Sequence, residues 1–253
     1  METKYRLSTK GVVHIWHTSA SFWKNKINEL DSVLSQDEIS RKQKLLSQNR
    51  QEDYIISRGI LRSILAQYLE EPPEEVFLET DPNGKPFLPG SNIRFNLSHS
   101  EGLFLYGFVL DVPIGVDLQQ VYPISSIRTI IKNNFSPHEQ HILFGEKESR
   151  LQDLFFRIWT AKEAYLKGTG EGFQKPANSF SICNKTNGMI HFELRKDADT
   201  LNNDGWNIRE LHLAKKYKAA LAVRGQITQI HFHSFTPLDS CSRNYIQDHE
   251  GKN

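Results

Sequence analysis

The chain has 253 residues, of which 38% are hydrophobic, so it can bury one large core or two smaller ones. Its 31 basic and 30 acidic residues leave a net charge of +1, which argues against a nucleic-acid or anionic-membrane partner. Two distant cysteines, Cys183 and Cys241, fit neither a disulfide framework nor a structural zinc site, and no apolar run is long enough to span a membrane. We expect a soluble, cytoplasmic protein.

The first third of the chain predicts one strand and three helices. Residues 12–16 alternate as a strand, and helical patterns cover residues 23–34, 37–46 and 54–69. The second helical pattern is basic, with Lys42 and Lys44, and Arg50 follows it. Such a run is as consistent with a solvated surface as with a phosphate-binding one.

The next segments combine turn chemistry with polar strand residues. Residues 81–86 read Asp-Pro-Asn-Gly-Lys-Pro, a turn that places Lys85 at its tip. Residues 93–102 begin as a strand and break into a polar loop that holds Ser98, His99 and Ser100. Adjacent residues of one loop cannot form a catalytic triad alone, so we expect them to donate hydrogen bonds to an anion. Residues 103–110 and 114–119 are predicted to form a hairpin.

Two carboxylates are placed by these patterns where they could converge. In the strand over residues 114–119, Asp117 and Gln119 point the same way, since side chains two apart share a face. A helix that runs up to glycines 168, 170 and 172 sets Glu163 and Lys167 four apart. Alone, that pair fits a surface ion pair. Together with the strand carboxylate, it is the minimum set for holding a divalent cation against phosphate.

The remaining patterns indicate an α+β chain with two halves. Helices are predicted at residues 124–131 and 137–144, and strands at 180–182, 189–194, 206–213, 218–223 and 227–232. Helices followed by strands thus occur twice. We expect an N-terminal subdomain over residues 1–112, a C-terminal subdomain over 113–235, and a disordered polar tail over 236–253.

Three motifs, in this order and spacing, resemble the 4'-phosphopantetheinyl transferases of the Sfp type. They are Phe-Asn-Leu-Ser-His-Ser at 95–100, Gly-Val-Asp-Leu-Gln at 115–119 and Trp-Thr-Ala-Lys-Glu-Ala-Tyr-Leu-Lys at 159–167. The resemblance covers roughly residues 12 to 225. It implies a monomeric, magnesium-dependent enzyme that moves the phosphopantetheine arm of coenzyme A to a serine of an acyl or peptidyl carrier protein, as in fatty acid, polyketide or nonribosomal peptide synthesis. It also implies an α/β fold of two similar subdomains related by a pseudo-twofold, with the active site at their interface.

The resemblance also implies roles for individual residues. The expected magnesium ligands are Asp117, Gln119 and Glu163, and the expected catalytic residues are Glu163, Lys167 and His99. The residues expected to bind coenzyme A are Ser98 and His99 at the pyrophosphate, Lys85 and Pro86 around the adenosine, and the cations Lys42, Lys44, Arg50, Lys162 and Lys167.

Two positions depart from the family pattern, and two other classes of function remain open. Many members have glutamate where this chain has Gln119, so its metal should bind more weakly. Members often show an acidic residue followed three later by arginine; here Arg50 precedes Asp53, so Arg50 or a lysine of 41–44 is expected to grip the ribose phosphate. A non-catalytic coenzyme A or carrier-protein binding module is one alternative. A metal-dependent nuclease is the other, although the near-zero net charge argues against it.

Overall fold

The computed structural model describes residues 7, 9–170, 175–195 and 205–237. The predicted tail, from residue 238 onward, and Cys241 lie outside the described residues. Among the described residues, no helix has the length and apolar character needed to cross a bilayer.

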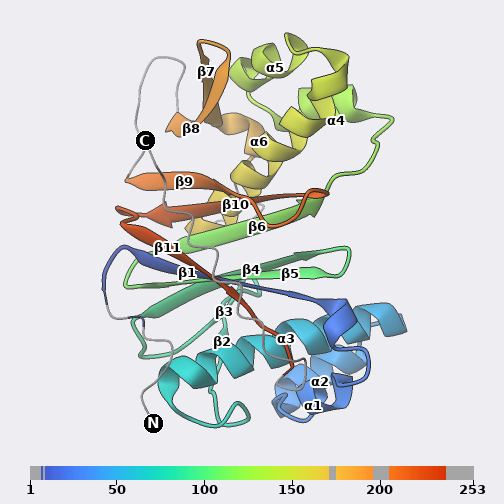
Figure 1. The fold of residues 1–253 in the computed structure, drawn as a ribbon, viewed down its shortest axis with the longest axis vertical. Coiled ribbons are helices and arrows are strands. Elements are labelled where there is room, and N and C mark those ends of the chain that lie inside the picture. Colours follow the sequence, from blue (N-terminus) through green and yellow to red (C-terminus); the bar gives the residue numbers. More distant parts are fainter. Residues whose placement is uncertain (1–6, 8, 171–174, 196–204, 238–253) are drawn as a thin grey trace.

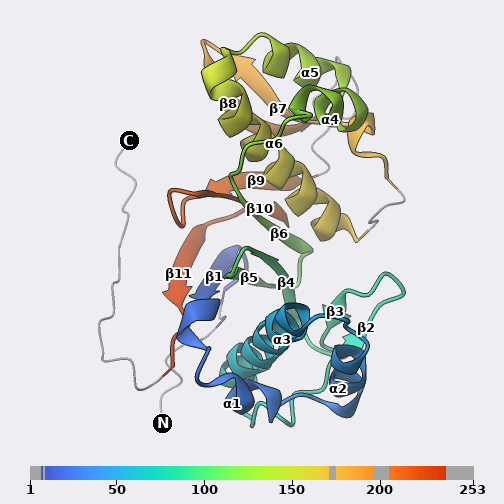
Figure 2. The same ribbon diagram turned by 90° about the vertical axis from the view of Figure 1, so that its right-hand side faces the viewer.

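Two sheets and two groups of helices form four layers (Figures 1 and 2). The helices α1–α3 cover the outer face of the first sheet, the second sheet lies on its inner face, and α4–α6 with a small hairpin cover the second sheet. The first sheet has the order β11-β1-β5-β4 and the second the order β6-β10-β9. The mixed α/β fold expected from the sequence is therefore confirmed, and each sheet is covered by its own group of helices.

The elements of the first half are β1 (Val12–Ser19), η1 (Ala20–Phe22), α1 (Ile27–Asp31), α2 (Gln36–Gln43), α3 (Gln48–Leu69), β2 (Glu79–Thr80), β3 (Pro86–Phe87), β4 (Ile93–Ser100) and β5 (Leu103–Leu110). Those that follow are β6 (Ile114–Gln120), α4 (Ile127–Asn134), α5 (Pro137–Phe144), α6 (Glu148–Thr169), η3 (Ala177–Ser179), β7 (Ser181–Thr186), β8 (Met189–Arg195), β9 (Trp206–Leu211), β10 (Tyr217–Arg224) and β11 (Gln229–Ser234).

Side chains on opposite faces of the first sheet contribute to two different hydrophobic cores. On β5, Phe104, Tyr106 and Phe108 pack against the helices, whereas Leu105 and Val109 face the second sheet. Side chains of a strand alternate between its faces, so one apolar strand can serve both cores. The first sheet is consequently fixed between its helices and the second sheet.

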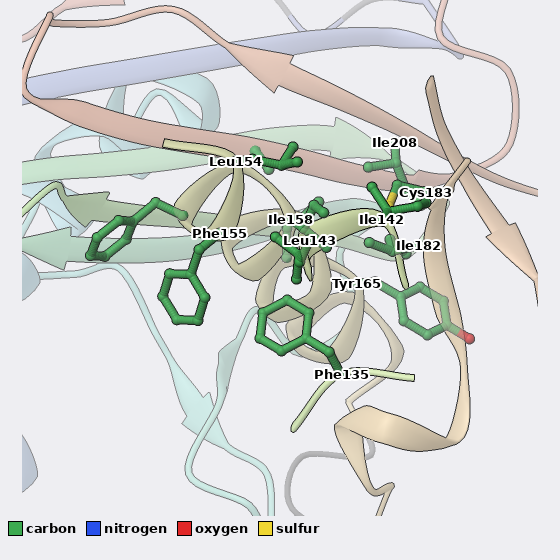
Figure 3. Packing of buried hydrophobic residues seen from close by; sticks show 14 of the residues in the cluster. Phe135, Ile142, Leu143, Leu154, Phe155, Ile158, Tyr165, Ile182, Cys183 and Ile208 are labelled. Atoms are coloured by element: carbon green, nitrogen blue, oxygen red, sulfur yellow. The ribbon is translucent and has the colours of Figure 1, made fainter. Parts of the chain in front are cut away.

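Helix α6 is the centre of the second half. Its buried residues, among them Phe155, Ile158 and Tyr165, pack with Phe135 and Ile182 (Figure 3). The helix ends at Gly170, whose φ of 73° is a left-handed conformation that glycine adopts without a steric penalty. At Gly115 of β6 an added Cβ would collide with the backbone of α6 at Ala164 and Gly168. The missing side chain of Gly115 therefore lets α6 lie directly on β6.

Three expectations about the strands are corrected. Residues 103–110 do not form a hairpin with 114–119, because β5 pairs with β4 and β1 while β6 pairs antiparallel with β10. The triplet 98–100 continues β4 and does not form a loop, because each of its residues pairs with a residue of β5.

The third correction concerns the last strand. β11, expected in the C-terminal half, pairs parallel with β1 of the first sheet, where it covers an otherwise open edge and adds Ile230 to the core between the sheets. We propose to keep the division into residues 1–112 and 113–235, with β11 crossing from the second half to the first.

Candidate active site

A cavity of about 580 Å³ lies where the two halves meet. The first half lines it from the residues before α3, from α3 itself and from β4; the second half lines it from β6 and α6. The lining residues are Leu45, Arg50, Asp53, Tyr54, Ser57, Arg58, Leu97, Ser98, His99, Asp117, Gln119, Glu163 and Lys167. The predicted placement of the site between the halves thus corresponds to a real cavity.

Asp117 accepts hydrogen bonds from three other lining residues of the cavity. Its Oδ1 accepts hydrogen bonds from Lys167 Nζ at 2.7 Å and from Ser98 Oγ at 3.0 Å. Its Oδ2 accepts from Gln119 Nε2 at 3.3 Å. The carboxylate is almost fully buried, so these donors replace the water that it gives up. The structure therefore joins four of the predicted site residues around one carboxylate.

Glu163 lies one helical turn before Lys167 on α6 and is the second cavity carboxylate contributed by the second half. Burial raises the pKa of Glu163, and the nearby charge of Asp117 raises it further. Two carboxylates that repel each other in this way are arranged for a cation to bind between them.

The donor set fits magnesium, a hard cation that takes a few carboxylate ligands and keeps several waters. Among the described residues, no cluster of three or more His, Cys, Asp or Glu side chains could hold a metal. Three carboxylates of the described part of the chain line the cavity, and of these Asp117 and Glu163 come from the second half while Asp53 comes from α3 of the first. Gln119 directs its amide nitrogen at Asp117 and here supports that carboxylate.

The first half contributes a wall of mixed charge. The His99 ring stacks on Phe104 with the ring centroids 5.3 Å apart. Partial loss of hydration lowers the pKa of His99, the charge of Asp53 opposes this shift, and that of Lys167 adds to it, which favours the neutral imidazole. His99 nevertheless remains exposed to solvent on β4. The guanidinium of Arg58 lies 5.6 Å from the centroid of the Tyr54 ring.

Sequence reasoning missed the contribution of α3 beyond Arg50. Asp53, Tyr54, Ser57 and Arg58 all line the cavity. Arg50, Tyr54 and Arg58 are four residues apart, the spacing that brings side chains onto one face of a helix. That periodicity is the signal that could have identified them.

The predicted turn with Lys85 touches the second half without lining the cavity. Lys85 Nζ donates to the Lys167 carbonyl at 2.8 Å and to the Ile114 carbonyl at 3.3 Å, and Asn83 Nδ2 donates to the Gly170 carbonyl at 2.9 Å. Burial lowers the pKa of Lys85 to about 8. In this structure the turn thus anchors the end of α6; Pro86 is buried in β3 and is likewise absent from the cavity wall.

Three lysines of the predicted coenzyme A set lie elsewhere. Lys162 is buried, and its Nζ donates to Glu139 Oε2 at 2.6 Å and to the Phe180 carbonyl at 2.8 Å. Its assignment to coenzyme A is corrected because, one residue before Glu163, it points about 100° away around the helix, into the core. Lys42 pairs with Asp31 at 2.6 Å, and Lys44 is exposed at the end of α2. Neither of these two is among the lining residues, whereas Arg50 is.

Comparison with known proteins agrees with this geometry. A family model described as the 4'-phosphopantetheinyl transferase superfamily matches residues 113–222, and one described as 4'-phosphopantetheinyl transferase, N-terminal, matches residues 15–106. The 4'-phosphopantetheinyl transferase HetI of Nostoc sp. is 36% identical over 167 residues, which are 64% of this chain and 70% of HetI. The 4'-phosphopantetheinyl transferase Sfp of Bacillus subtilis is 28% identical over 178 residues, 65% of this chain and 78% of Sfp.

A holo-(acyl-carrier-protein) synthase structure from Bacillus anthracis aligns with 46% of this chain and 96% of its own, at 21% identity and a TM-score of 0.36. Each half of the fold is thus matched by a family model of 4'-phosphopantetheinyl transferases. The chain belongs to the 4'-phosphopantetheinyl transferase superfamily.

Proposed function

We propose that the protein transfers the 4'-phosphopantetheine moiety of coenzyme A to a serine of an acyl or peptidyl carrier protein and releases adenosine 3',5'-bisphosphate. The observation that carries the proposal is the cavity between the halves, in which Asp117, Glu163 and Lys167 from one half face His99 and the α3 arginines from the other. Membership in the superfamily supports the same activity.

In this reaction the serine oxygen forms a bond to the phosphorus that bears the pantetheine. The bond from that phosphorus to the bridging oxygen breaks, the adenosine bisphosphate leaves with that oxygen, and the proton of the serine hydroxyl passes to solvent water. Asp117 and Glu163 would hold magnesium, which would supply positive charge beside the pyrophosphate.

The side chains around the cavity supply the remaining binding and charge stabilisation. Lys167, already held beside Asp117, places an ammonium where negative charge grows on the leaving group. Arg50 and Arg58 offer guanidinium groups to the phosphates, and a neutral His99 can donate one ring N–H to a phosphate oxygen. Each of these roles uses a side chain that lines the cavity.

The second candidate function is a binding module that holds coenzyme A or a carrier protein without catalysis. Gln119 is the observation that favours it, because an amide at this position adds no negative charge to the metal site. The nuclease alternative gains no comparable support from the contacts of the cavity.

The test is incubation of the protein with coenzyme A, magnesium chloride and an apo carrier protein, followed by mass spectrometry of the carrier. We expect a mass increase of one phosphopantetheine group on the serine, and no increase when a chelator replaces the magnesium. A carrier that an established transferase modifies but that this protein leaves unchanged would contradict the proposal. The magnesium requirement, the monomeric state and the cytoplasmic location are predictions from the sequence, and size-exclusion chromatography tests the second of them.

A further inference from the structure

A row of side chains joins the two sheets beside the cavity. Three residues of β4, each two apart, accept hydrogen bonds from backbone N–H groups of β6, each also two apart. The pairs are Val116 N–H to Asn96 Oδ1 at 2.9 Å, Leu118 N–H to Ser98 Oγ at 3.3 Å, and Gln120 N–H to Ser100 Oγ at 3.0 Å. The constant offset of 20 residues means that β4 and β6 run parallel along this row, which we call the seam.

The seam provides partners for an otherwise open strand edge. β6 is the last strand of its sheet and has β10 on one side. A strand points alternate N–H groups to opposite sides, so those of residues 116, 118 and 120 point away from β10. Val116 and Leu118 are fully buried, and a buried N–H group without a partner is costly. The polar side chains of β4 therefore replace a backbone ladder at this edge.

The seam brackets a site residue on each strand. Asp117 lies between Val116 and Leu118, whose N–H groups are held by Asn96 and Ser98. On β4, His99 lies between the seam residues Ser98 and Ser100. The hydrogen bonds of the seam thus hold the strand positions of both Asp117 and His99, which lie on opposite halves.

Ser98 is fully engaged in the seam and in the site together. Its hydroxyl donates to Asp117 and accepts from Leu118 N–H and from Lys167 Nζ at 2.9 Å. A hydroxyl has one donor and two acceptor positions, so all of them are used. The donation to a pyrophosphate expected of Ser98 would require release of Asp117.

We propose that Asn96 and Ser100 are positioning residues for phosphopantetheine transfer, because with Ser98 they set the distance and register between the two walls of the cavity. The proposal rests on the transferase function proposed above. Neither Asn96 nor Ser100 lines the cavity, so both act through Asp117 and His99. A substrate that spans both halves meets the side chains of both walls in the correct geometry only while the hydrogen bonds of the seam are intact. Small misplacements of those side chains lower the reaction rate by large factors.

The experiment compares variants that remove or keep a seam acceptor. Ser100→Ala removes the hydroxyl that holds Gln120 N–H, whereas Ser100→Thr keeps it. Asn96→Leu removes the other acceptor at similar size. The matched control is Ser63→Ala, which removes a half-buried serine hydroxyl that bonds the Gly59 carbonyl within α3, away from the seam.

The expected result is a fall of about tenfold in kcat for Ser100→Ala and Asn96→Leu, with a smaller change in the KM for coenzyme A. The amide of residue 120 should exchange its hydrogen faster in Ser100→Ala, and Ser100→Thr should recover both the rate and the protection. Ser63→Ala, at a similar thermal midpoint, should keep the wild-type kcat.

Three outcomes would overturn the proposal. In one, kcat falls in proportion to the loss of thermal midpoint, and it does so to the same degree in the seam variants and in Ser63→Ala. In another, the kcat of Ser100→Thr is as low as that of Ser100→Ala. The third is unchanged exchange at residue 120. A wild-type protein without transfer activity would refute the proposed function and the positioning role together, whereas active wild type with unimpaired variants refutes the positioning role alone.

Discussion

At the scale of single residues, Asp117 shares its carboxylate among three side chains, and this sharing determines how the site responds to substitution. Lys167, Ser98 and Gln119 all donate to it. Removing its charge should therefore affect the proposed metal site and the position of Lys167 at once, while the surrounding apolar core is untouched.

Asp117→Asn and Glu163→Gln should each lower the rate of transfer by at least about 100-fold, because each removes one of two carboxylate charges at the metal. Glu163→Gln preserves side-chain shape and removes the repulsion with Asp117, so its thermal midpoint should change by only a few degrees. Asp117→Asn should lower the thermal midpoint further, because an amide cannot accept from all three donors and the ion pair with Lys167 is lost. The carrier modification rate by mass spectrometry and a thermal melt check the two expectations. Near wild-type turnover in either variant would show that the metal site is assigned wrongly.

Gln119→Glu should act in opposite directions with and without magnesium. A glutamate would place a third negative charge next to Asp117, so the magnesium concentration for half-maximal rate should fall severalfold. Without magnesium, the same charge should lower the thermal midpoint through repulsion. A magnesium titration and two melts measure both effects. An unchanged or higher magnesium requirement would mean that residue 119 does not face the metal.

Neighbouring residues show where sequence reasoning succeeded and failed at this scale. The spacing of Glu163 and Lys167 predicted correctly that both face one side of α6. Lys162 was expected to bind coenzyme A, although it enters the core and pairs with Glu139. A buried lysine is rare, and its partner is 23 residues away in the chain on α5. Local patterns carry no information about such a distant partner.

At the scale of elements, the contact between β6 and α6 sets the distance between Asp117 and the two charged residues of the helix. Backbone lies against backbone at Gly115, where an added Cβ would overlap the Ala164 carbonyl oxygen and Gly168 N. These atoms belong to the backbone of a helix and cannot move aside as a flexible side chain would.

Gly115→Ala should therefore destabilise the protein by more than about 3 kcal/mol and abolish transfer, because α6 must shift away from β6. The control is Gly145→Ala at the end of α5, where φ is −78° and an added Cβ would lie 3.2 Å from the His141 carbonyl oxygen. That variant should lose less than about 1 kcal/mol. Urea unfolding measures both, and equal stabilities of the two variants would contradict the close-approach argument.

Element pairing was the weakest part of the sequence-based prediction. The short link between residues 110 and 114 favours a hairpin, yet β6 pairs with β10, about 100 residues further along the chain. Strand preference depends on packing against neighbours that are distant in sequence, so a short connection alone cannot choose the partner. The existence of both strands was nevertheless predicted correctly from their apolar runs.

At the scale of the whole molecule, several histidines lie close together where β11 pairs with β1. His14 on β1 lies with its ring centroid 5.1 Å from that of His233 on β11. Burial first, and repulsion from neighbouring histidines second, lower the pKa of each of these two histidines to about 4. His14 Nδ1 also forms a 2.8 Å hydrogen bond with the Tyr68 hydroxyl.

The protein should therefore lose stability as the pH falls from about 6.5 toward 4. An unfolded histidine with a pKa near 6.5 binds a proton in this range while the folded one does not, so acid favours the unfolded state. Above pH 7 neither state is protonated and the contribution is complete. Urea unfolding at pH 7.5, 6 and 5 measures the loss, and His233→Phe should reduce its slope. A slope in that variant equal to the wild-type slope would exclude His233 as a source.

The large-scale organisation was predicted in part. The recurrence of helices followed by strands predicted two halves, and the motifs predicted that the site lies between them. The pairing of β11 with the first sheet was not predicted, since residues 227–232 follow the strands of the second half without any break in composition. Which open edge a final strand covers is decided by the assembled sheet and not by its own residues.

The pairing of β11 with β1 also constrains the order of events during synthesis. A ribosome delivers residues 12–19 before the strands of the second sheet, but their parallel partner at 229–234 emerges only after β6, β9 and β10 of that sheet. Until then β1 has one free edge, which is a hazard for association between nascent chains. We expect the first sheet to reach its native form only after translation has passed residue 234, and stalled chains that end before β11 to be much more sensitive to protease than the released protein. Contacts between such distant segments also form slowly, so refolding from urea should be slow for a chain of this size.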